Sequence, residues 1–252
     1  MEINLVKKEL DLQLKSKKIN EVTFEANCQD LYLTFDIDWC SDEVLLYTLD
    51  LIEKYNIKAT FFVTHETKLL ERMRNNPNIE LGIHPNFNPL LNGDFRYGKN
   101  IDEVIEYYKT IVPEAISSRS HSLTQSAQIL QSMIKHGIEY DCNIFIPFDS
   151  DIKIKPYYCL NKKITRIPYM WEDDLHEYNK WDYKEILKIL DVSSFNVLDF
   201  HPIHIYLNSY SMDNYNNARE YLYDTNELKK FINDDCFGSK DFLESIIKKV
   251  VK

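Results

Sequence analysis

The feature that most constrains the fold of this chain is an alternation of strand-like and helix-like segments that begins at residue 31. Strand-like segments are rich in β-branched and aromatic residues, and amphipathic segments with helical spacing separate them. The predicted strands cover residues 31–37, 58–64, 79–84, 115–120, 138–142, 164–171 and 195–201. Such alternation is typical of a parallel sheet, either open and doubly wound or closed into a barrel.

Helix signals support this reading of the segments between the strands. Ser41 and Asp42 can cap the first helix, and Gly137 stands where a helix over 124–136 should end. Further helices are predicted over 100–112 and 181–190, and from about residue 214 onward. We interpret 31–252 as a single domain with a helical C-terminal tail, because no linker or repeat interrupts it. Residues 1–30 form an N-terminal extension that could hold a strand pair.

Composition excludes several classes of function. The formal net charge of −10 opposes binding to nucleic acid or to anionic membranes, and five Gly leave little material for glycine-rich phosphate loops. No apolar stretch approaches membrane-spanning length, and the N-terminal residues lack a signal-peptide pattern. Five scattered Cys without a CxxC pair fit a reducing compartment. We therefore expect a cytoplasmic protein without membrane insertion, and the sequence does not indicate its oligomeric state.

Polar side chains stand at the ends of several predicted strands. The loop HPNFNP after Ile83 contains two prolines that exclude a regular helix or central strand, so His84 is presented where a strand stops. Because the carboxyl ends of parallel strands meet at one rim, residues far apart in sequence would converge there. The residues placed in this way are Asp36, Asp38, His65, His84, Arg119, His121, Trp171, Asp173, Asp174 and His201.

These side chains form a nitrogen and oxygen ligand set that suits a divalent cation of the zinc, cobalt, nickel or manganese kind. A cation with an open coordination position lowers the pKa of bound water towards about 7. A neighbouring carboxylate, held ionised by an arginine, could take a second proton, and a histidine opposite could protonate a leaving amine. The predicted chemistry is metal-assisted hydrolysis of an amide or ester.

The ordered motifs of the chain resemble those of the polysaccharide deacetylases, which are carbohydrate esterase family 4 proteins with the NodB homology domain. The motifs are TFDID (34–38), KATFFVT (58–64), the His-centred loop at 84–88, RSHS (119–122) and LDFHP (198–202). The chain resembles the WbmS-like branch, associated with surface-polysaccharide biosynthesis, more closely than the secreted chitin deacetylases. The resemblance implies an irregular (β/α)7-type barrel. It also implies an enzyme that removes N-acetyl groups from amino sugars with the help of a divalent metal ion, and we expect this ion to be Zn²⁺.

The resemblance also implies roles for individual residues. Asp36 matches the family's base and Asp38 is the nearest candidate metal ligand, although alternation along a strand would leave the two roles exchangeable. His84 matches a metal ligand. Asn88 stands where the family has a second histidine, and His121 could supply the missing imidazole.

The remaining motifs imply further roles at the same site. Arg119 resembles the arginine that orients the base, and His201 matches the general acid. WEDD (171–174) loosely resembles a motif in which a tryptophan, here Trp171, shapes the pocket and an aspartate, here Asp174, tunes the acid histidine. Leu198 would form the apolar wall before that histidine. By contrast, we expect His204 to pack near the site or to support it, and His176 to lie at the surface.

Two other functions fit the same residues. One is a hydrolase that acts on a small non-sugar amide. The other is a catalytically inactive barrel that binds a glycan, which the split aspartate pair and Asn88 make a real alternative. A binding module, however, has no need for Asp36, Arg119 and His201 together, whereas a hydrolase uses all three.

Overall fold

The computed structural model describes residues 13–25, 27–193 and 195–251, and it contains one ten-stranded sheet within that part of the chain. All seven predicted strands are present. They are β2 (Asp30–Asp36), β3 (Ala59–Val63), β4 (Ile79–Ile83), β5 (Ser117–Ser118), β6 (Tyr140–Phe145), β8 (Ile164–Tyr169) and β10 (Asn196–Phe200). The other three strands are β1 (Lys15–Lys17), β7 (Tyr157–Cys159) and β9 (Trp171–Glu172).

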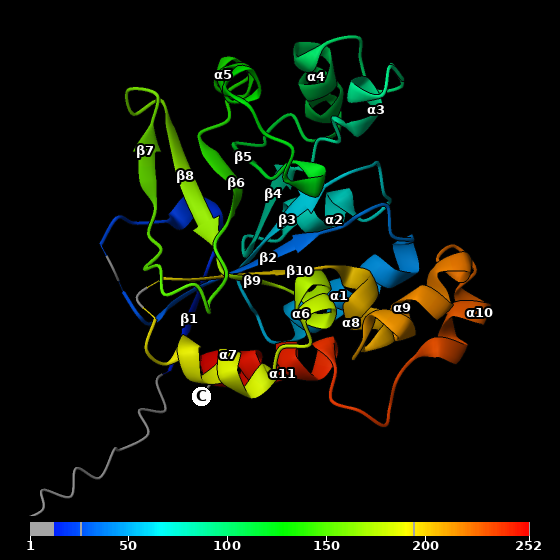
Figure 1. Cartoon of the computed structure of the whole chain (residues 1–252). Helices are drawn as coiled ribbons and strands as arrows, with labels where there is room; N and C mark the ends of the chain where they lie inside the picture. The colour runs from blue at the N-terminus through cyan, green and yellow to red at the C-terminus, as the bar shows by residue number, and fades with distance from the viewer. Residues whose placement is uncertain (1–12, 26, 194, 252) are drawn as a thin grey trace, which may run out of the picture.

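Hydrogen-bonded neighbours follow the order β7-β8-β6-β5-β4-β3-β2-β10-β9 (Figure 1). The β7–β8 pair is antiparallel, and the other pairs along this path are parallel. Two strands pair with successive parts of β2. β1 pairs with residues 30–32 of β2, and β3 pairs with residues 34–36. The strand row is open, with β7 and β9 at its ends in the described part of the chain.

The strand predicted over 164–171 is split at Met170. The Met170 N–H donates to Val197 O at 3.0 Å, so the chain leaves its pairing with β6 and crosses to the β10 side of the row. Every residue of β2, β3, β4 and β10 is buried, as expected for parallel strands covered on both faces. Phe35 stacks on Phe61 and Phe200 across neighbouring strands.

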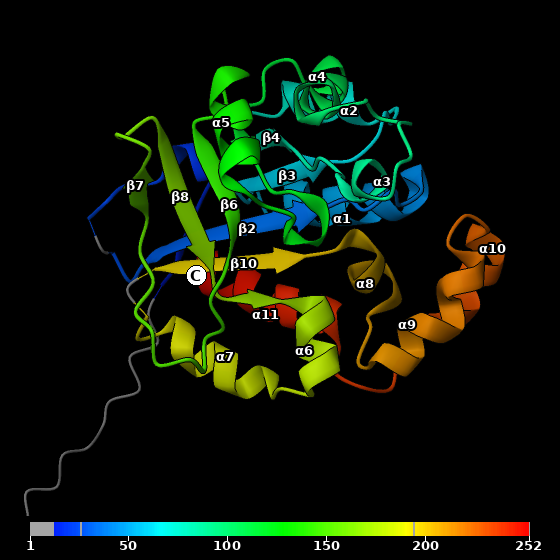
Figure 2. The same cartoon turned by 45° about the horizontal axis from the view of Figure 1, so that its top comes forward.

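Helices surround the strand row (Figures 1 and 2). The longest are α1 (Asp42–Lys54), α4 (Ile101–Ile111), α5 (Ala127–Lys135), α7 (Tyr183–Leu190) and α11 (Ser239–Val250). The shorter helices are α2 (Leu70–Asn75), α3 (Asn88–Leu91), α6 (Asp173–Asn179), α8 (Pro202–Leu207), α9 (Met212–Ala218) and α10 (Thr225–Leu228). Single 3₁₀ turns complete the fold as η1 (Ile19–Glu21), η2 (His121–Leu123), η3 (Arg219–Tyr221) and η4 (Lys229–Phe231). Ser41 caps α1 as predicted, since its side chain accepts the Val44 N–H.

Two helices that the sequence analysis did not predict begin directly at the ends of strands. α6 follows β9 and starts at Asp173, while α8 follows β10, with His201 at its N-cap and Pro202 at its first position. α11 closes this part of the core by packing Phe242 against Trp171 and Phe200. In the residues that the structure describes, every helix is too short or too polar to cross a membrane.

Candidate active site

Asp38, His84 and His121 bring three potential metal-binding atoms together beyond the carboxyl ends of β2, β4 and β5. Asp38 Oδ1 lies 3.2 Å from His84 Nε2 and 3.4 Å from His121 Nδ1. No hydrogen bond satisfies this oxygen among the described residues, although it is buried. Two ligands held at about 2.0–2.1 Å on a tetrahedral cation are separated by about 3.3–3.4 Å. The spacing and the missing hydrogen bond therefore fit three side chains that could share a divalent cation.

The local backbone explains how these residues meet. β2 ends at Asp36, and the chain then turns through Asp38 and Trp39, which have positive φ angles of 32° and 53°. This turn brings Asp38 back towards β4. The loops that carry the two histidines are joined, because the His121 N–H donates to Pro85 O at 3.0 Å. Burial alone would raise the pKa of Asp38, but His121 and His84 hold that pKa well below its usual range.

Asn88, the alternative metal ligand, is engaged elsewhere. Its side-chain amide donates to Ser122 Oγ at 3.2 Å, and its carbonyl oxygen accepts from Thr124 Oγ1 at 3.3 Å. Asn88 is also absent from the walls of the cavity that Asp38, His84 and His121 line. Of the two candidates, His121 is the one that the structure brings to Asp38.

A buried arginine joins Asp36 to a second carboxylate on β10. Arg119 Nη1 donates to Asp36 Oδ1 at 3.0 Å and also to Asp199 Oδ1. The guanidinium lies between the rings of Phe62 and Tyr169, with its central carbon 4.8 Å and 4.4 Å from their centroids. Burial raises the pKa of Asp199 well above its usual range, against the opposing effect of Arg119. The other oxygen of Asp36 lies 3.4 Å from His84 Nδ1, so Asp36 sits between the arginine and a candidate metal ligand.

His201 faces the same site from the end of β10. Its Nδ1 lies 2.6 Å from Asp173 Oδ1, and its Nε2 lies 3.7 Å from Asp38 Oδ2. Although burial lowers the pKa of His201, Asp173 and Asp174 raise it well above its usual range. The aspartate bonded to His201 is thus Asp173, whereas the sequence analysis assigned this contact to Asp174. Asp174, the next residue of α6, bonds His204 instead and stays near His201 without a hydrogen bond to it.

Asp174 instead bonds His204, whose Nε2 lies 2.6 Å from its Oδ1. The other ring nitrogen of His204 lies 3.2 Å from the buried carboxylate of Glu177. Burial lowers the pKa of His204, but Asp173 and Asp174 raise it well above its usual range. His204 therefore supports the site, as expected, and it anchors Asp174 at the edge of the cavity.

Trp171 and Leu198 do not line the cavities of the site. Both are fully buried on paired strands, β9 and β10. The Trp171 indole N–H donates to His176 Nδ1 at 3.0 Å, and its ring packs in the core against Phe200. The expectation that these two side chains form walls of the pocket is therefore wrong, because both lie among the packed strands beneath it. His176, expected at the surface, is buried by the same contact.

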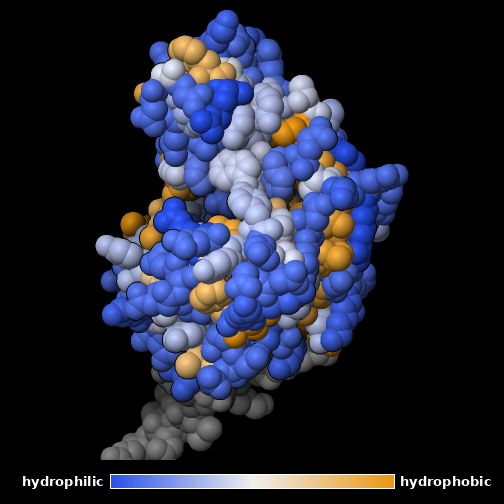
Figure 3. All heavy atoms as spheres, turned by 90° about the vertical axis from the view of Figure 1, so that its right-hand side faces the viewer, coloured by the Kyte–Doolittle hydropathy of each residue, from blue (hydrophilic) through white to orange (hydrophobic). Residues whose placement is uncertain are grey.

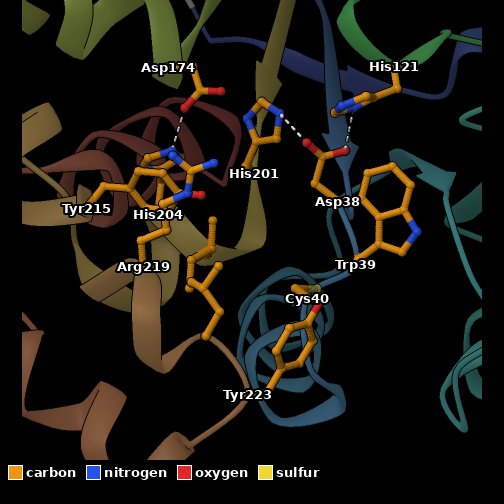
Figure 4. Close-up of a pocket in the computed structure, with 12 residues that line it drawn as sticks. Asp38, Trp39, Cys40, His121, Asp174, His201, His204, Tyr215, Arg219 and Tyr223 are labelled. Atoms are coloured by element: carbon orange, nitrogen blue, oxygen red, sulfur yellow. Dashed lines mark hydrogen bonds and ion pairs between the residues drawn. The ribbon is translucent and has the colours of Figure 1, made fainter. Parts of the chain in front are cut away.

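Two adjoining cavities open above these residues and share Asp38, His121, Asp174 and His201 in their walls. The smaller, of about 140 Å³, reaches down to Asp36 and His84. The larger, of about 320 Å³, extends towards the C-terminal helices. Figure 4 shows Asp38 placed between His121 and His201 in the larger cavity. Figure 3 views the side of the molecule towards which β2 and β10 point, where a mostly hydrophilic surface surrounds a recess.

Asp173 was expected at the rim, but its contact with His201 was not predicted, and neither were Asp199 and the contacts of His204. The sequence holds a signal for two of these residues. Asp199 is the second residue of LDFHP, and an acidic residue inside a buried, largely apolar strand requires a partner. Asp173 stands beside Asp174 in WEDD, but only the start of α6 determines which of the two reaches His201.

Comparison with solved structures identifies a similar protein over nearly the whole chain. That protein is WbmS from Bordetella bronchiseptica, a candidate polysaccharide deacetylase described as involved in O-antigen biosynthesis. Its sequence is 38% identical, the TM-score is 0.84, and the match covers 95% of this chain and 98% of the Bordetella chain. A family 4 carbohydrate esterase from Streptomyces lividans is more distant, at 10% identity and a TM-score of 0.46 over 87% of this chain and 88% of that one. That likeness is too low to carry an argument. No curated protein matches the chain significantly.

The sequence of the chain also matches a family as a whole. Residues 33–219 match the family described as WbmS-like polysaccharide deacetylases, and this range covers most of the chain. The predicted α/β architecture of the NodB deacetylase kind is confirmed by the large, mainly parallel sheet and by the close match to the Bordetella structure. The chain belongs to the WbmS-like polysaccharide deacetylase family.

Proposed function

We propose that this protein is a metal-dependent hydrolase that removes an N-acetyl or other N-acyl group from an amino sugar of a surface-polysaccharide intermediate. The observation that carries the proposal is the convergence of Asp38, His84 and His121 beside the Asp36–Arg119 pair and His201. The description of the Bordetella relative as involved in O-antigen biosynthesis supports this class of substrate.

Asp38, His84 and His121 would hold the cation, with Asp38 Oδ1, which accepts no hydrogen bond from the described residues, as its anionic ligand. One carboxylate with two imidazoles suits zinc and also cobalt, nickel or manganese. When bound, such a cation polarises the acyl carbonyl and makes water a stronger nucleophile near neutral pH. Asp36 Oδ2 faces His84 Nδ1 at 3.4 Å, an arrangement in which a carboxylate orients a ligand histidine.

Two residues that line the smaller cavity would move the protons. Asp36, held by Arg119, accepts a proton from the attacking water. His201 donates a proton from Nε2 to the leaving amine, while Asp173 holds its other ring nitrogen. Asp173 and Asp174 raise the pKa of His201, which favours the protonated imidazole that a proton donor requires.

The experiment combines metal analysis with acetate release. The purified protein is equilibrated with zinc or cobalt, desalted and analysed for bound metal, and acetate release from N-acetylated amino sugars is then measured. We expect about one metal ion per chain and metal-dependent release of acetate. His84→Ala should lose both, whereas Asn88→Ala should keep the metal. A wild-type protein that binds no metal under these conditions would favour the inactive glycan-binding alternative.

A further inference from the structure

The larger cavity of the site has a wall that the proposed chemistry does not use. Beyond Asp38 and His201, this cavity is bounded by the C-terminal elements α9 and η3 and the residues that follow them. Tyr215 from α9, Arg219 from η3 and Tyr223 line it there. Figure 4 shows the Arg219 side chain extending towards the part of the cavity that His204 lines.

Within the described part of the chain, Arg219 differs from the other five arginines in having no carboxylate partner. The chain contains six arginines and 40 acidic residues, and five of those arginines form ion pairs. These five are Arg72, Arg74, Arg96, Arg119 and Arg166. Among the described residues, which include all six arginines, no hydrogen bond or ion pair engages the Arg219 side chain. In a protein with a net charge of −10, the unpaired guanidinium is thus the one that faces the site.

The carboxylates that share the cavity with Arg219 are held by other groups. Asp174 is bound by His204 at 2.6 Å, and Asp38 faces His84 and His121 at 3.2 Å and 3.4 Å. Neither forms an ion pair with Arg219, so its N–H groups remain available to a ligand. A guanidinium presents its donors in a planar fork that matches a carboxylate or a phosphate.

We propose that Arg219 binds an anionic group of the substrate, so that the enzyme selects acylated sugars that carry a carboxylate or a phosphate. This inference rests on the proposed function, because the same cavity would hold the acylated sugar. Trp39 and Tyr223 line the cavity with aromatic surface on which the apolar face of a sugar ring could pack. The anion would be the carboxylate of a uronic acid or the phosphate of an activated sugar, two sources that share the same chemistry.

The test compares Arg219→Gln with a matched control, Arg96→Gln. Arg96 pairs with Asp94 within its own loop and lies outside the walls of both cavities, so its substitution removes the same charge without touching the site. The probes are N-acetylglucosamine, N-acetylglucosamine 1-phosphate and N-acetylgalactosaminuronate. Binding is measured by calorimetry on zinc-supplemented protein that also carries Asp36→Asn, so that the probes are not consumed. Acetate release is measured separately with Asp36 intact.

Arg219→Gln should weaken binding of at least one anionic probe by about tenfold or more, as for loss of a charge-assisted hydrogen bond. Binding of neutral N-acetylglucosamine should be unchanged, and Arg96→Gln should bind all probes like its parent. The probe that loses more affinity identifies the carboxylate or the phosphate as the preferred anion. Equal affinities of Arg219→Gln and its parent for both anions, or no preference of the parent for either anion over the neutral sugar, would overturn the proposal.

The two readouts separate this inference from the proposed function. Arg219-dependent binding without acetate release from any probe would reject the hydrolase and retain the anion site. Acetate release whose preference among the probes is the same in Arg219→Gln would retain the hydrolase and reject the anion site.

Discussion

Asp173 contacts His201 with both of its carboxylate oxygens. Oδ2 accepts the His201 backbone N–H at 2.7 Å, and Oδ1 lies 2.6 Å from the ring nitrogen Nδ1. One side chain on α6 therefore fixes both the backbone and the ring of a residue at the end of β10. With Nδ1 held in this way, Nε2 is the nitrogen that faces the cavity and Asp38. The same carboxylate opposes the effect of burial and raises the pKa of His201.

Asp173→Asn should impair turnover and move the alkaline limit of activity to lower pH. Because the Asp173 carboxylate raises the pKa of His201, a neutral amide at that position lowers this pKa. As pH rises, the variant then loses its protonated donor earlier than the wild type. We expect kcat near neutral pH to fall by about 10²-fold, within the range for a general acid. The measurement is the pH profile of kcat, and an unchanged alkaline limb would remove Asp173 as the tuning residue.

Asp174→Asn provides the matched comparison, because Asp174 bonds His204 and affects His201 only at longer range. Its alkaline limb should shift in the same direction but by less than that of Asp173→Asn. If Asp174→Asn gave the larger shift, the two neighbouring aspartates would have the reverse roles, as the sequence analysis expected.

His121→Ala should weaken metal binding strongly, while Asn88→Ala should not. His121 Nδ1 lies 3.4 Å from Asp38 Oδ1, whereas the Asn88 side chain is engaged by Ser122 and Thr124. Since loss of a residue that merely supports a ligand costs about 10–100-fold in affinity, loss of His121 should cost at least about 100-fold. Titration of zinc against a chromophoric chelator gives both affinities. Equal losses in the two variants would return Asn88 to the set of ligands.

The sequence predicted most of the fold because the strand and helix signals are local. The alternation of strand-like and helix-like segments identified all seven main strands, and Ser41 and Gly137 marked helix ends where the structure has them. The missed helices α2, α3, α6 and α8 have four to seven residues. Segments this short have too few turns to display helical periodicity, so tertiary contacts decide their structure. The expectation that the HPNFNP loop excludes a helix is wrong for α3, because Pro89 stands in its first turn, where proline is tolerated.

The site was less predictable, because its partnerships join residues far apart in sequence. Strand ends correctly predicted that Asp38, His84 and His201 would converge, since all parallel strands deliver their ends to one rim. Which aspartate reaches His201, and whether Trp171 faces the cavity or the core, depend on the orientation of single side chains at β9 and α6. Motif spacing carries no information about that orientation.

Asp36→Asn should abolish hydrolysis while leaving metal uptake largely intact. Asp36 is bound by Arg119 and is not one of the three proposed ligands Asp38, His84 and His121, so the cation would keep its ligands. Loss of a general base lowers kcat by about 10²–10⁴-fold. Metal content and acetate release are measured on the same preparation. If Asp36→Asn lost the metal and Asp38→Asn retained it, the roles assigned to the two residues would be reversed.

Removal of the metal should lower the thermal stability of the protein without unfolding it. Asp38, His84 and His121 lie at the rim of the sheet, while the core is formed by the apolar strands and by helices such as α11. A cation at 100 times its Kd adds about 2.7 kcal/mol to the free energy of unfolding. For a domain of this size, that corresponds to a rise in Tm of about 5–10 °C. Thermal melts with zinc and with a chelator test this, and His84→Ala should melt at the same temperature in both.

Arg119→Met should destabilise the fold as well as abolish activity. The methionine roughly keeps the volume between Phe62 and Tyr169, but it leaves the carboxyl groups of Asp36 and Asp199 buried without their cation. Removing one partner of a buried ion pair costs about 3–5 kcal/mol, because the remaining charge stays desolvated. Urea unfolding should therefore give a lower midpoint with an unchanged m-value. Arg96→Met, which breaks an exposed pair, should leave the midpoint unchanged. A wild-type midpoint in Arg119→Met would mean that the pair serves only to position Asp36.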